Sequence, residues 1–133
     1  VSISDIVDAT GTPVYIYSAK TIRDAYRAID GAFAEYPHRI HYALKANSSL
    51  AVVRLLRELG SAVDANSIGE IDLAMRAGFD PSDIVFTGVG KSPDEIDRAV
   101  QLGLKAINAE SGGELERIDR AKPRRDVVFL VEQ

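Results

Sequence analysis

The chain has 133 residues, enough for one modest domain with a hydrophobic core, and 46% of them are hydrophobic and 27% charged, as in ordinary globular proteins. Its net charge of -4 and the lack of any basic run argue against a nucleic-acid partner. No apolar run is long enough to span a membrane and cysteine is absent, so we expect a cytoplasmic protein that does not enter a membrane.

The first part of the chain carries one clear helix signal. Residues 1–10 show no strong pattern, and Gly11-Thr12-Pro13 marks a turn before residues 14–17, a β-rich run that predicts a short strand. Ser18 can cap a helix over 19–35, in which apolar residues recur at helical spacing. A proline two residues beyond ends that helix.

A strand that ends on a lysine follows, over residues 39–47. Its side chains alternate between two faces with a period of two, Ile40, Tyr42 and Leu44 on one and His41, Ala43 and Lys45 on the other. Ligands of α/β proteins bind at the carboxyl ends of the strands, and the small Ala43 leaves room for one beside the Lys45 amine.

Position alone leaves plainer interpretations of this strand open. A lysine at a strand end more often reaches solvent or contacts a phosphate as a point charge than takes part in chemistry. His41, which shares the face of Lys45 by parity, is more often a packed and hydrogen-bonded core residue than a catalyst.

Strands and helices then alternate with a nearly constant period. Candidate strands start near residues 39, 61, 83, 104 and 126, which is 21 or 22 residues apart each time. Amphipathic helices are predicted between them, over 50–59, 68–77, 93–102 and 112–121. This alternation favours a parallel sheet, either doubly wound or closed into a (β/α)8 barrel. A leucine-rich solenoid has a similar period, but its leucine framework is missing.

Three of these helices open with the same sequence device. A serine stands before the helix and a glutamate three residues on, the pattern of a capping box, in Ser67 with Glu70, Ser92 with Glu95, and Ser111 with Glu114. Glycines mark the expected helix ends at Gly60, Gly78 and Gly103.

Asp64 ends the second strand of the series, residues 61–64, and shares a face with Ala62 by parity. Since sequential parallel strands are often neighbours, Asp64 would stand beside Lys45, where a carboxylate keeps an amine protonated and oriented. An aspartate that caps the turn before Ser67 is an equally good interpretation on spacing alone.

Residues 86–92 look like a nucleotide-phosphate loop but fail its pattern, because Val85 stands where the first glycine is required. We assign Lys91 no catalytic role. Two histidines and no cysteine give no basis for a transition-metal site. Residues 108–111 end the fourth strand, and helix capping accounts for part of that stretch.

Together these motifs resemble one family. Residues 42–48, Tyr-Ala-Leu-Lys-Ala-Asn-Ser, are similar to the lysine strand of the pyridoxal-phosphate enzymes that share the barrel of alanine racemase and the basic amino-acid decarboxylases. Residues 63–70 and 86–91 resemble the next stretches of the decarboxylases, in the same order and spacing. Alanine racemase itself continues differently after Lys45-Ala46-Asn47. The closest resemblance is to the diaminopimelate decarboxylase group, from about residue 12 to residue 120.

This resemblance implies a fold and a chemistry. The chain would be a single domain, the N-terminal part of a TIM-type (β/α)8 barrel, with a leading segment over 1–17 and βα units over 18–133 that supply about five of the eight strands. The rest of the barrel and a β-domain would be absent. Lys45 would bind pyridoxal 5'-phosphate covalently, with Asp64 and Ala43 also at the cofactor. The full-length enzyme, a lyase of lysine biosynthesis, would be a homodimer that converts the small molecule meso-diaminopimelate to lysine.

Two alternatives remain within this resemblance. A sister enzyme that acts on ornithine or arginine would share these motifs, and a truncated non-catalytic relative would act as a binding protein. The end of the chain also departs from the family, because it reads Leu130-Val131-Glu132-Gln133 without the usual arginine. The last strand, 127–131, would expose an unpaired edge, so we expect the chain alone to associate and to bind the cofactor weakly.

Overall fold

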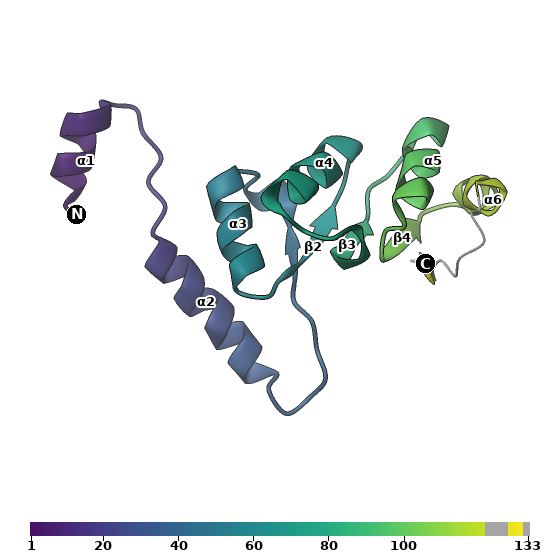
Figure 1. The fold of residues 1–133 in the computed structure, drawn as a ribbon, viewed down its shortest axis with the longest axis horizontal. Coiled ribbons are helices and arrows are strands. Elements are labelled where there is room, and N and C mark those ends of the chain that lie inside the picture. Colours follow the sequence, from purple (N-terminus) through teal and green to yellow (C-terminus); the bar gives the residue numbers. More distant parts are fainter. Residues whose placement is uncertain (122–127, 132–133) are drawn as a thin grey trace.

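The structure contains a sheet of five parallel strands in sequence order (Figure 1). The computed structural model describes residues 1–121 and 128–131. The strands are β1 (His41–Ala43), β2 (Ala62–Ala65), β3 (Ile84–Phe86), β4 (Ala106–Ala109) and β5 (Val128–Val131). Each lies beside the next one in the chain, which is the arrangement that successive βα units of a barrel produce.

The helices between the strands begin and end close to their predicted positions. They are α3 (Leu50–Glu58), α4 (Ile68–Ala77), α5 (Pro93–Leu102) and α6 (Gly112–Arg120), and α2 (Ala19–Ala32) precedes β1. Two single-turn helices, η1 (Leu44–Ala46) and η2 (Pro81–Asp83), adjoin β1 and β3. No helix among the described residues has the length and apolar character needed to cross a membrane.

The N-terminal segment differs from its prediction in two ways. Helix α1 (Ile3–Thr10) was not predicted, although Ser2 and Asp5 form a complete capping box at its start. The strand predicted over 14–17 was wrong: these residues are exposed and unpaired in the described structure, because no neighbouring strand accepts their backbone hydrogen bonds. Figure 1 shows α1 lying apart from the sheet, beyond the start of α2.

The sheet register repeats the period of the sequence. His41 pairs with Ala62 and Val85 with Ala106, both 21 residues on, and Ala106 pairs with Val128, 22 residues on. Each βα unit therefore adds one strand at the same level as the strand before it. A consequence is that residues paired across neighbouring strands share one face of the sheet.

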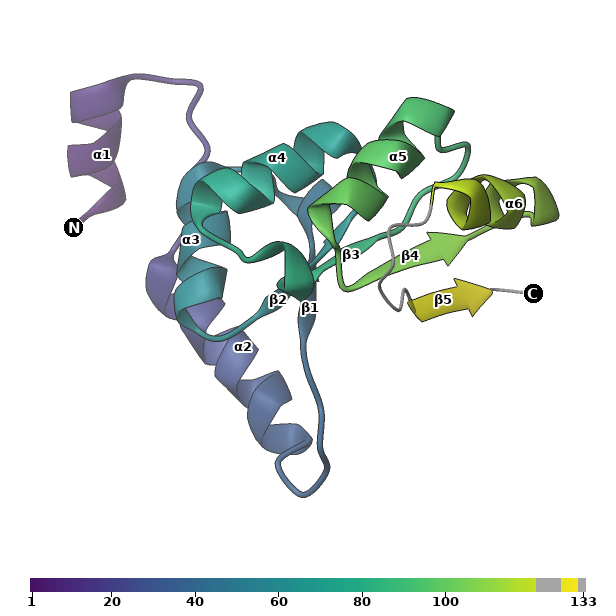
Figure 2. The same cartoon turned by 45° about the vertical axis from the view of Figure 1, so that its right-hand side comes forward.

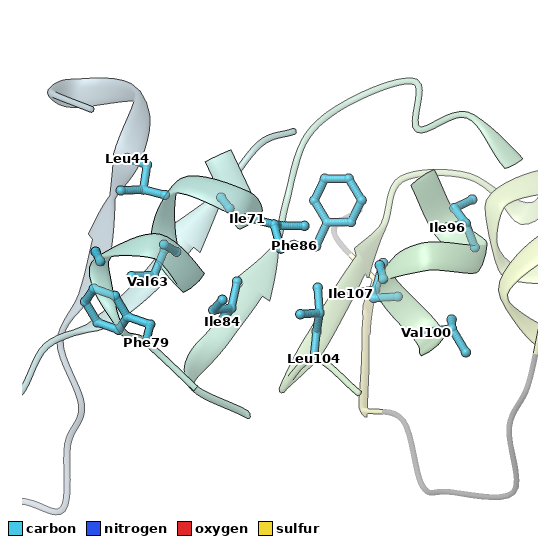
Figure 3. Close-up of a cluster of buried hydrophobic side chains, with 14 of the residues drawn as sticks. Leu44, Val63, Ile71, Phe79, Ile84, Phe86, Ile96, Val100, Leu104 and Ile107 are labelled. Atoms are coloured by element: carbon cyan, nitrogen blue, oxygen red, sulfur yellow. The ribbon is translucent and has the colours of Figure 1, made fainter. Parts of the chain in front are cut away.

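The hydrophobic core lies between one face of the sheet and the helices α3 to α6 (Figure 2). The sheet contributes the strand residues of that face, and these are at most 1% exposed: Val63, Ala65, Ile84, Phe86, Ile107 and Ala109. Helix residues pack against them, including Val53, Ile71, Ile96 and Ile118. Figure 3 shows several of these side chains meeting between the strands and the helices.

The opposite face of the sheet carries small and polar residues, among them Ala43, Ala62, Asp64 and Asn108. A doubly wound sheet has helices on both faces, whereas in a barrel the second face is turned inward. Helices on one face alone therefore agree with the predicted barrel segment and not with its doubly wound alternative.

Serine caps set the start of three helices, as predicted. The hydroxyls of Ser67, Ser92 and Ser111 each accept the N–H three residues on. Of these three caps only that of Ser92 is a complete capping box. For the other two, the predicted hydrogen bond from the serine N–H to the glutamate carboxylate was wrong. There the glutamate carboxylate accepts the N–H of the residue before the serine instead, as Glu70 does from Asn66. Each such glutamate ties the strand end to the helix start.

Candidate functional site

Lys45 lies just past the end of β1, on the single turn η1. The predicted strand over 39–47 was too long, because the chain leaves the sheet after Ala43. The Tyr42 hydroxyl donates to the Asn47 carbonyl at 3.0 Å and closes this turn, while Leu44 is fully buried in the core. The Lys45 side chain is exposed, and its amine forms no hydrogen bond or ion pair with the described part of the chain.

Asp64 stands on the strand next to the lysine strand. β1 and β2 are neighbours, as predicted, and Ala43 pairs directly with Asp64 in the register. Both residues are on the face of the sheet that carries no helices. The Asp64 Oδ1 atom is buried and has no hydrogen-bond partner. The alternative role in helix capping is not seen, because Ser67 and Glu70 supply the hydrogen bonds at the start of α4.

His41 is a half-buried residue at the start of β1, hydrogen-bonded as its plainer interpretation predicted but outside the buried core. Its Nδ1 lies 3.3 Å from the Val63 carbonyl oxygen, and its Nε2 lies 3.3 Å from the Lys105 amine. Burial lowers the pKa of His41 below its usual value, and the Lys105 charge adds to this effect. A neutral ring in contact with a lysine at the amino end of the sheet fits a packing role.

Asn108 and Thr87 are two polar residues near the carboxyl ends of β4 and β3, and the sequence analysis gave neither of them a site role. Asn108 on β4 is 9% exposed, and its Nδ2 donates to the Thr87 hydroxyl at 3.1 Å. Its Oδ1 is buried without a partner, as is the Asp64 Oδ1. The parity of β3 and β4 could have revealed this row of polar groups along the carboxyl ends of β2 to β4.

Lys91 belongs to a buried ion pair with Glu114, also missed by the sequence analysis. The Lys91 side chain is 1% exposed and that of Glu114 is 3% exposed, with 3.2 Å between Nζ and Oε2. The Lys91 amine also donates to the Gly88 carbonyl at 2.5 Å and the Asn108 carbonyl at 2.7 Å. Glu114 accepts two backbone N–H groups as well, from Lys91 and Glu110. All three ammonium protons thus have an acceptor.

Acid is expected to weaken this pair. Burial alone would raise the pKa of Glu114, but the hydrogen bonds from Glu110 and Lys91 outweigh it and hold the pKa below the usual value. A depressed pKa stabilises the fold at pH above the unfolded-state pKa of about 4.3, and this contribution is lost as the pH falls through the folded-state pKa. Denaturant unfolding of the wild type and Glu114→Gln should therefore show a stability gap at pH 6 that shrinks toward pH 3. A gap independent of pH would contradict it.

An apolar cavity of about 550 Å³ lies beside β1, between it and the helices α2 and α3. Helix α2 contributes Ile22, Ala25, Tyr26 and Ile29 to its wall, and α3 contributes Val52 and Leu56. Residues of both parities of β1 line it, including Tyr42 and Ala43, so it follows the edge of the strand rather than one face. Lys45 and Asp64 are not among its lining residues. The cavity therefore adjoins the candidate site and shares Ala43 with it.

Comparison with known proteins identifies the family to which the chain is similar. The family model for the pyridoxal binding domain of the pyridoxal-dependent decarboxylases matches residues 19–133. A diaminopimelate decarboxylase of Vibrio cholerae is 45% identical over 120 residues, which is 90% of this chain and 29% of that protein.

Solved structures agree in fold. The crystal structure of diaminopimelate decarboxylase from Helicobacter pylori complexed with L-lysine has a TM-score of 0.86 at 41% identity, over 90% of this chain and 30% of that one. A lysine/ornithine decarboxylase from Vibrio vulnificus complexed with putrescine has a TM-score of 0.85 at 30% identity, over 97% of this chain and 34% of that one. The chain therefore spans about a third, or less, of the length of these relatives.

Proposed function

The chain belongs to the pyridoxal-dependent decarboxylase family, and we propose that it is part of an enzyme that decarboxylates meso-diaminopimelate to lysine. One observation carries this proposal: the free amine of Lys45 follows β1, and the neighbouring strand holds Asp64 with a buried oxygen that lacks a partner. A buried carboxylate oxygen without a hydrogen-bond partner is costly unless a ligand engages it, and the exposed Lys45 amine is free to react with such a ligand.

These residues fit pyridoxal 5'-phosphate. The cofactor has an aldehyde that reacts with an amine, and Lys45 offers an amine with no competing partner in the described chain. Its ring carries groups that hydrogen-bond to a carboxylate, and the Asp64 Oδ1 needs a donor. Ala43, which pairs with Asp64 and stands two residues before Lys45, adds no bulk that would block a planar ring. When bound, the cofactor supplies an electron sink for the pair released as carbon dioxide leaves.

The residues of the chain would bind and orient the cofactor. The Lys45 amine would hold the cofactor at the carboxyl end of β1. The Asp64 carboxylate would favour the protonated form of a nitrogen held near it, because a nearby negative charge stabilises that form. The buried core beneath β1 and β2 fixes the spacing of the two groups.

Identity to the relatives supports diaminopimelate as the substrate. The Helicobacter pylori enzyme of that name is 41% identical to the chain, against 30% for the lysine/ornithine decarboxylase with nearly the same TM-score. A lysine or ornithine decarboxylase is the second candidate, because that likeness in fold extends over 97% of the chain. A non-catalytic binding protein is disfavoured by Lys45 and Asp64 together.

We further infer the context of the chain in its parent protein. Residues 1–133 would form the N-terminal part of a (β/α)8 barrel. A further strand would pair with the free edge of β1 and cover the apolar cavity there. The parent enzyme would also carry a β-domain and form a homodimer. A role in amino-acid biosynthesis and the absence of cysteine support the cytoplasm as its location.

The test of the proposed function is a substrate comparison. The full-length protein, loaded with pyridoxal phosphate, is incubated separately with meso-diaminopimelate, L-ornithine, L-arginine and L-lysine, and carbon dioxide release is measured. The highest kcat/KM is expected for meso-diaminopimelate. A preference for ornithine or lysine would select the second candidate, and no release with any of them would overturn the enzyme proposal.

Asp64→Asn is expected to lower turnover of the full-length enzyme about tenfold or more, and to lower by about 1 or more the pKa at which the bound cofactor titrates in its absorption spectrum. The reason is that the substitution removes the charge that favours the protonated nitrogen while keeping the shape of the side chain. Asp97→Asn, an exposed residue of α5, is the matched control. An unchanged titration together with a lower melting temperature would make Asp64 a structural residue only.

A further inference from the structure

The Lys91–Glu114 pair joins three segments that are far apart in sequence. Lys91 ends the loop after β3, the Asn108 carbonyl lies near the end of β4, and Glu114 lies in the first turn of α6. Desolvating two charges is expensive, and apolar residues of similar volume usually stabilise a protein as well or better. Stability alone therefore does not account for this pair. An ion pair can do what apolar side chains cannot, because it fixes the direction of several backbone groups at once.

One set of contacts leads from the pair to β2. The Lys91 amine donates to the Gly88 carbonyl, and Gly88 lies so close to β2 that an added Cβ would be 2.7 Å from the Asn66 carbonyl oxygen. The preceding residue, Thr87, donates its N–H to the Ala65 carbonyl at 2.8 Å. Lys91 therefore holds the loop after β3 in contact with Ala65 and Asn66, the two residues that directly follow Asp64.

A second set of contacts leads to β4. The Lys91 amine holds the Asn108 carbonyl, and the Asn108 side chain donates to the Thr87 hydroxyl on the face that also carries Asp64. Glu114 holds the next turn by accepting the Glu110 N–H. The ends of β2, β3 and β4 are thus tied together at the side of the sheet where barrels bind their ligands.

We propose that the buried Lys91–Glu114 pair is a positioning element, which holds the carboxyl ends of β2 to β4 so that Asp64 and Asn108 keep their places at the cofactor side of the sheet. This inference rests on the proposed function. Lys91 and Glu114 lie outside the reacting groups and act through Gly88, Thr87 and the Asn108 backbone. Displacements of about 1 Å in a site can cost a hundredfold in rate, so a positioning role has a measurable kinetic effect.

The decisive variant removes both charges from the full-length holoenzyme. In Lys91→Met with Glu114→Met the apolar side chains fill the site without leaving an uncompensated charge, so the double variant is expected to fold. Its kcat should fall by about tenfold to a hundredfold, with a much smaller change in KM and with Lys45 still attached to the cofactor. Lys20→Met, at an exposed ion pair of α2, is the control and should leave kcat unchanged. A folded double variant with kcat within about twofold of the wild type would overturn the proposal.

If the double variant does not fold, a second variant still tests the proposal. Glu114→Asp keeps the charge and shortens its reach, and it is expected to lower kcat while the melting temperature changes little. Amide exchange in the cofactor-free protein adds a readout that is independent of activity: the Thr87 and Glu110 N–H groups should exchange faster in Glu114→Asp than in Lys20→Met. Unchanged exchange and unchanged kcat would overturn the inference. A wild type that binds no pyridoxal phosphate would overturn the proposed function alone, and exchange would still decide the positioning role.

Discussion

Lys45→Ala in the full-length enzyme is expected to abolish covalent attachment of pyridoxal phosphate and to lower turnover at least a thousandfold, on the order of what removal of a catalytic nucleophile costs in other enzymes. The loss follows because no other described lysine occupies an equivalent position. Lys91 is fully engaged in its buried ion pair, and Lys20 lies on α2 with its amine bonded to Asp24. Carbon dioxide release and the absorption band of the bound cofactor measure both effects.

Borohydride reduction followed by peptide mapping locates the attachment site directly. The reduced cofactor should be found on the peptide that contains Lys45 in the wild type and in the Lys20→Met control. An adduct on Lys91 or Lys20 in the wild type would refute the assignment. Full activity of Lys45→Ala would do so as well, and would also remove the main support for a pyridoxal-phosphate mechanism.

The 133 residues expressed alone are expected to show no measurable decarboxylation and to associate in solution. β1 has a partner strand on one side only within the described structure, and the apolar cavity of about 550 Å³ runs along its other edge. Unpaired strand edges with apolar surroundings invite pairing with a second chain. Cofactor affinity should also be low, because Lys45 and Asp64 provide no phosphate-binding group.

Gel filtration with light scattering, together with an assay on meso-diaminopimelate, measures both parts of this expectation. Charged substitutions in the cavity wall, such as Ile29→Lys on α2, should reduce association if the β1 edge is responsible. The matched control is Arg27→Ala on an exposed position of the same helix. A monomer that turns over diaminopimelate would contradict both the dependence on further strands and the barrel context behind it.

Helix positions could be predicted from the sequence because their signals are local. Ser67, Ser92 and Ser111 cap helices that start at the predicted residue, since a serine hydroxyl needs only an N–H three residues away. The end of β1 could not be predicted in this way. It depends on the Tyr42 hydroxyl reaching the Asn47 carbonyl and on Leu44 entering the core, which are tertiary contacts. Alternation of side chains therefore overstated the length of that strand.

The candidate site was predictable only in part, for a similar reason. Strand order was enough to predict that the strand of Asp64 lies beside the strand that Lys45 follows, and the register pairs Asp64 with Ala43. The Lys91–Glu114 pair joins residues 23 positions apart across a loop, a strand and a helix start. No local pattern predicts such a pair, and the glutamate had a sufficient local explanation as half of a capping box. The structure shows that this carboxylate accepts from Glu110 and Lys91 instead.

The constant step between paired strands also bears on how the chain folds. Every pairing in the sheet joins residues 21 or 22 positions apart, as in His41 with Ala62 and Ala106 with Val128, so each closes a loop of almost equal length. The entropy of loop closure depends on that length, and no pairing gains an advantage over the others from it. Nucleation is therefore left to differences in packing, and the fully buried Val63, Ile84 and Phe86 favour β2 and β3 as the starting pair. Strands would then add outward in both directions from that pair.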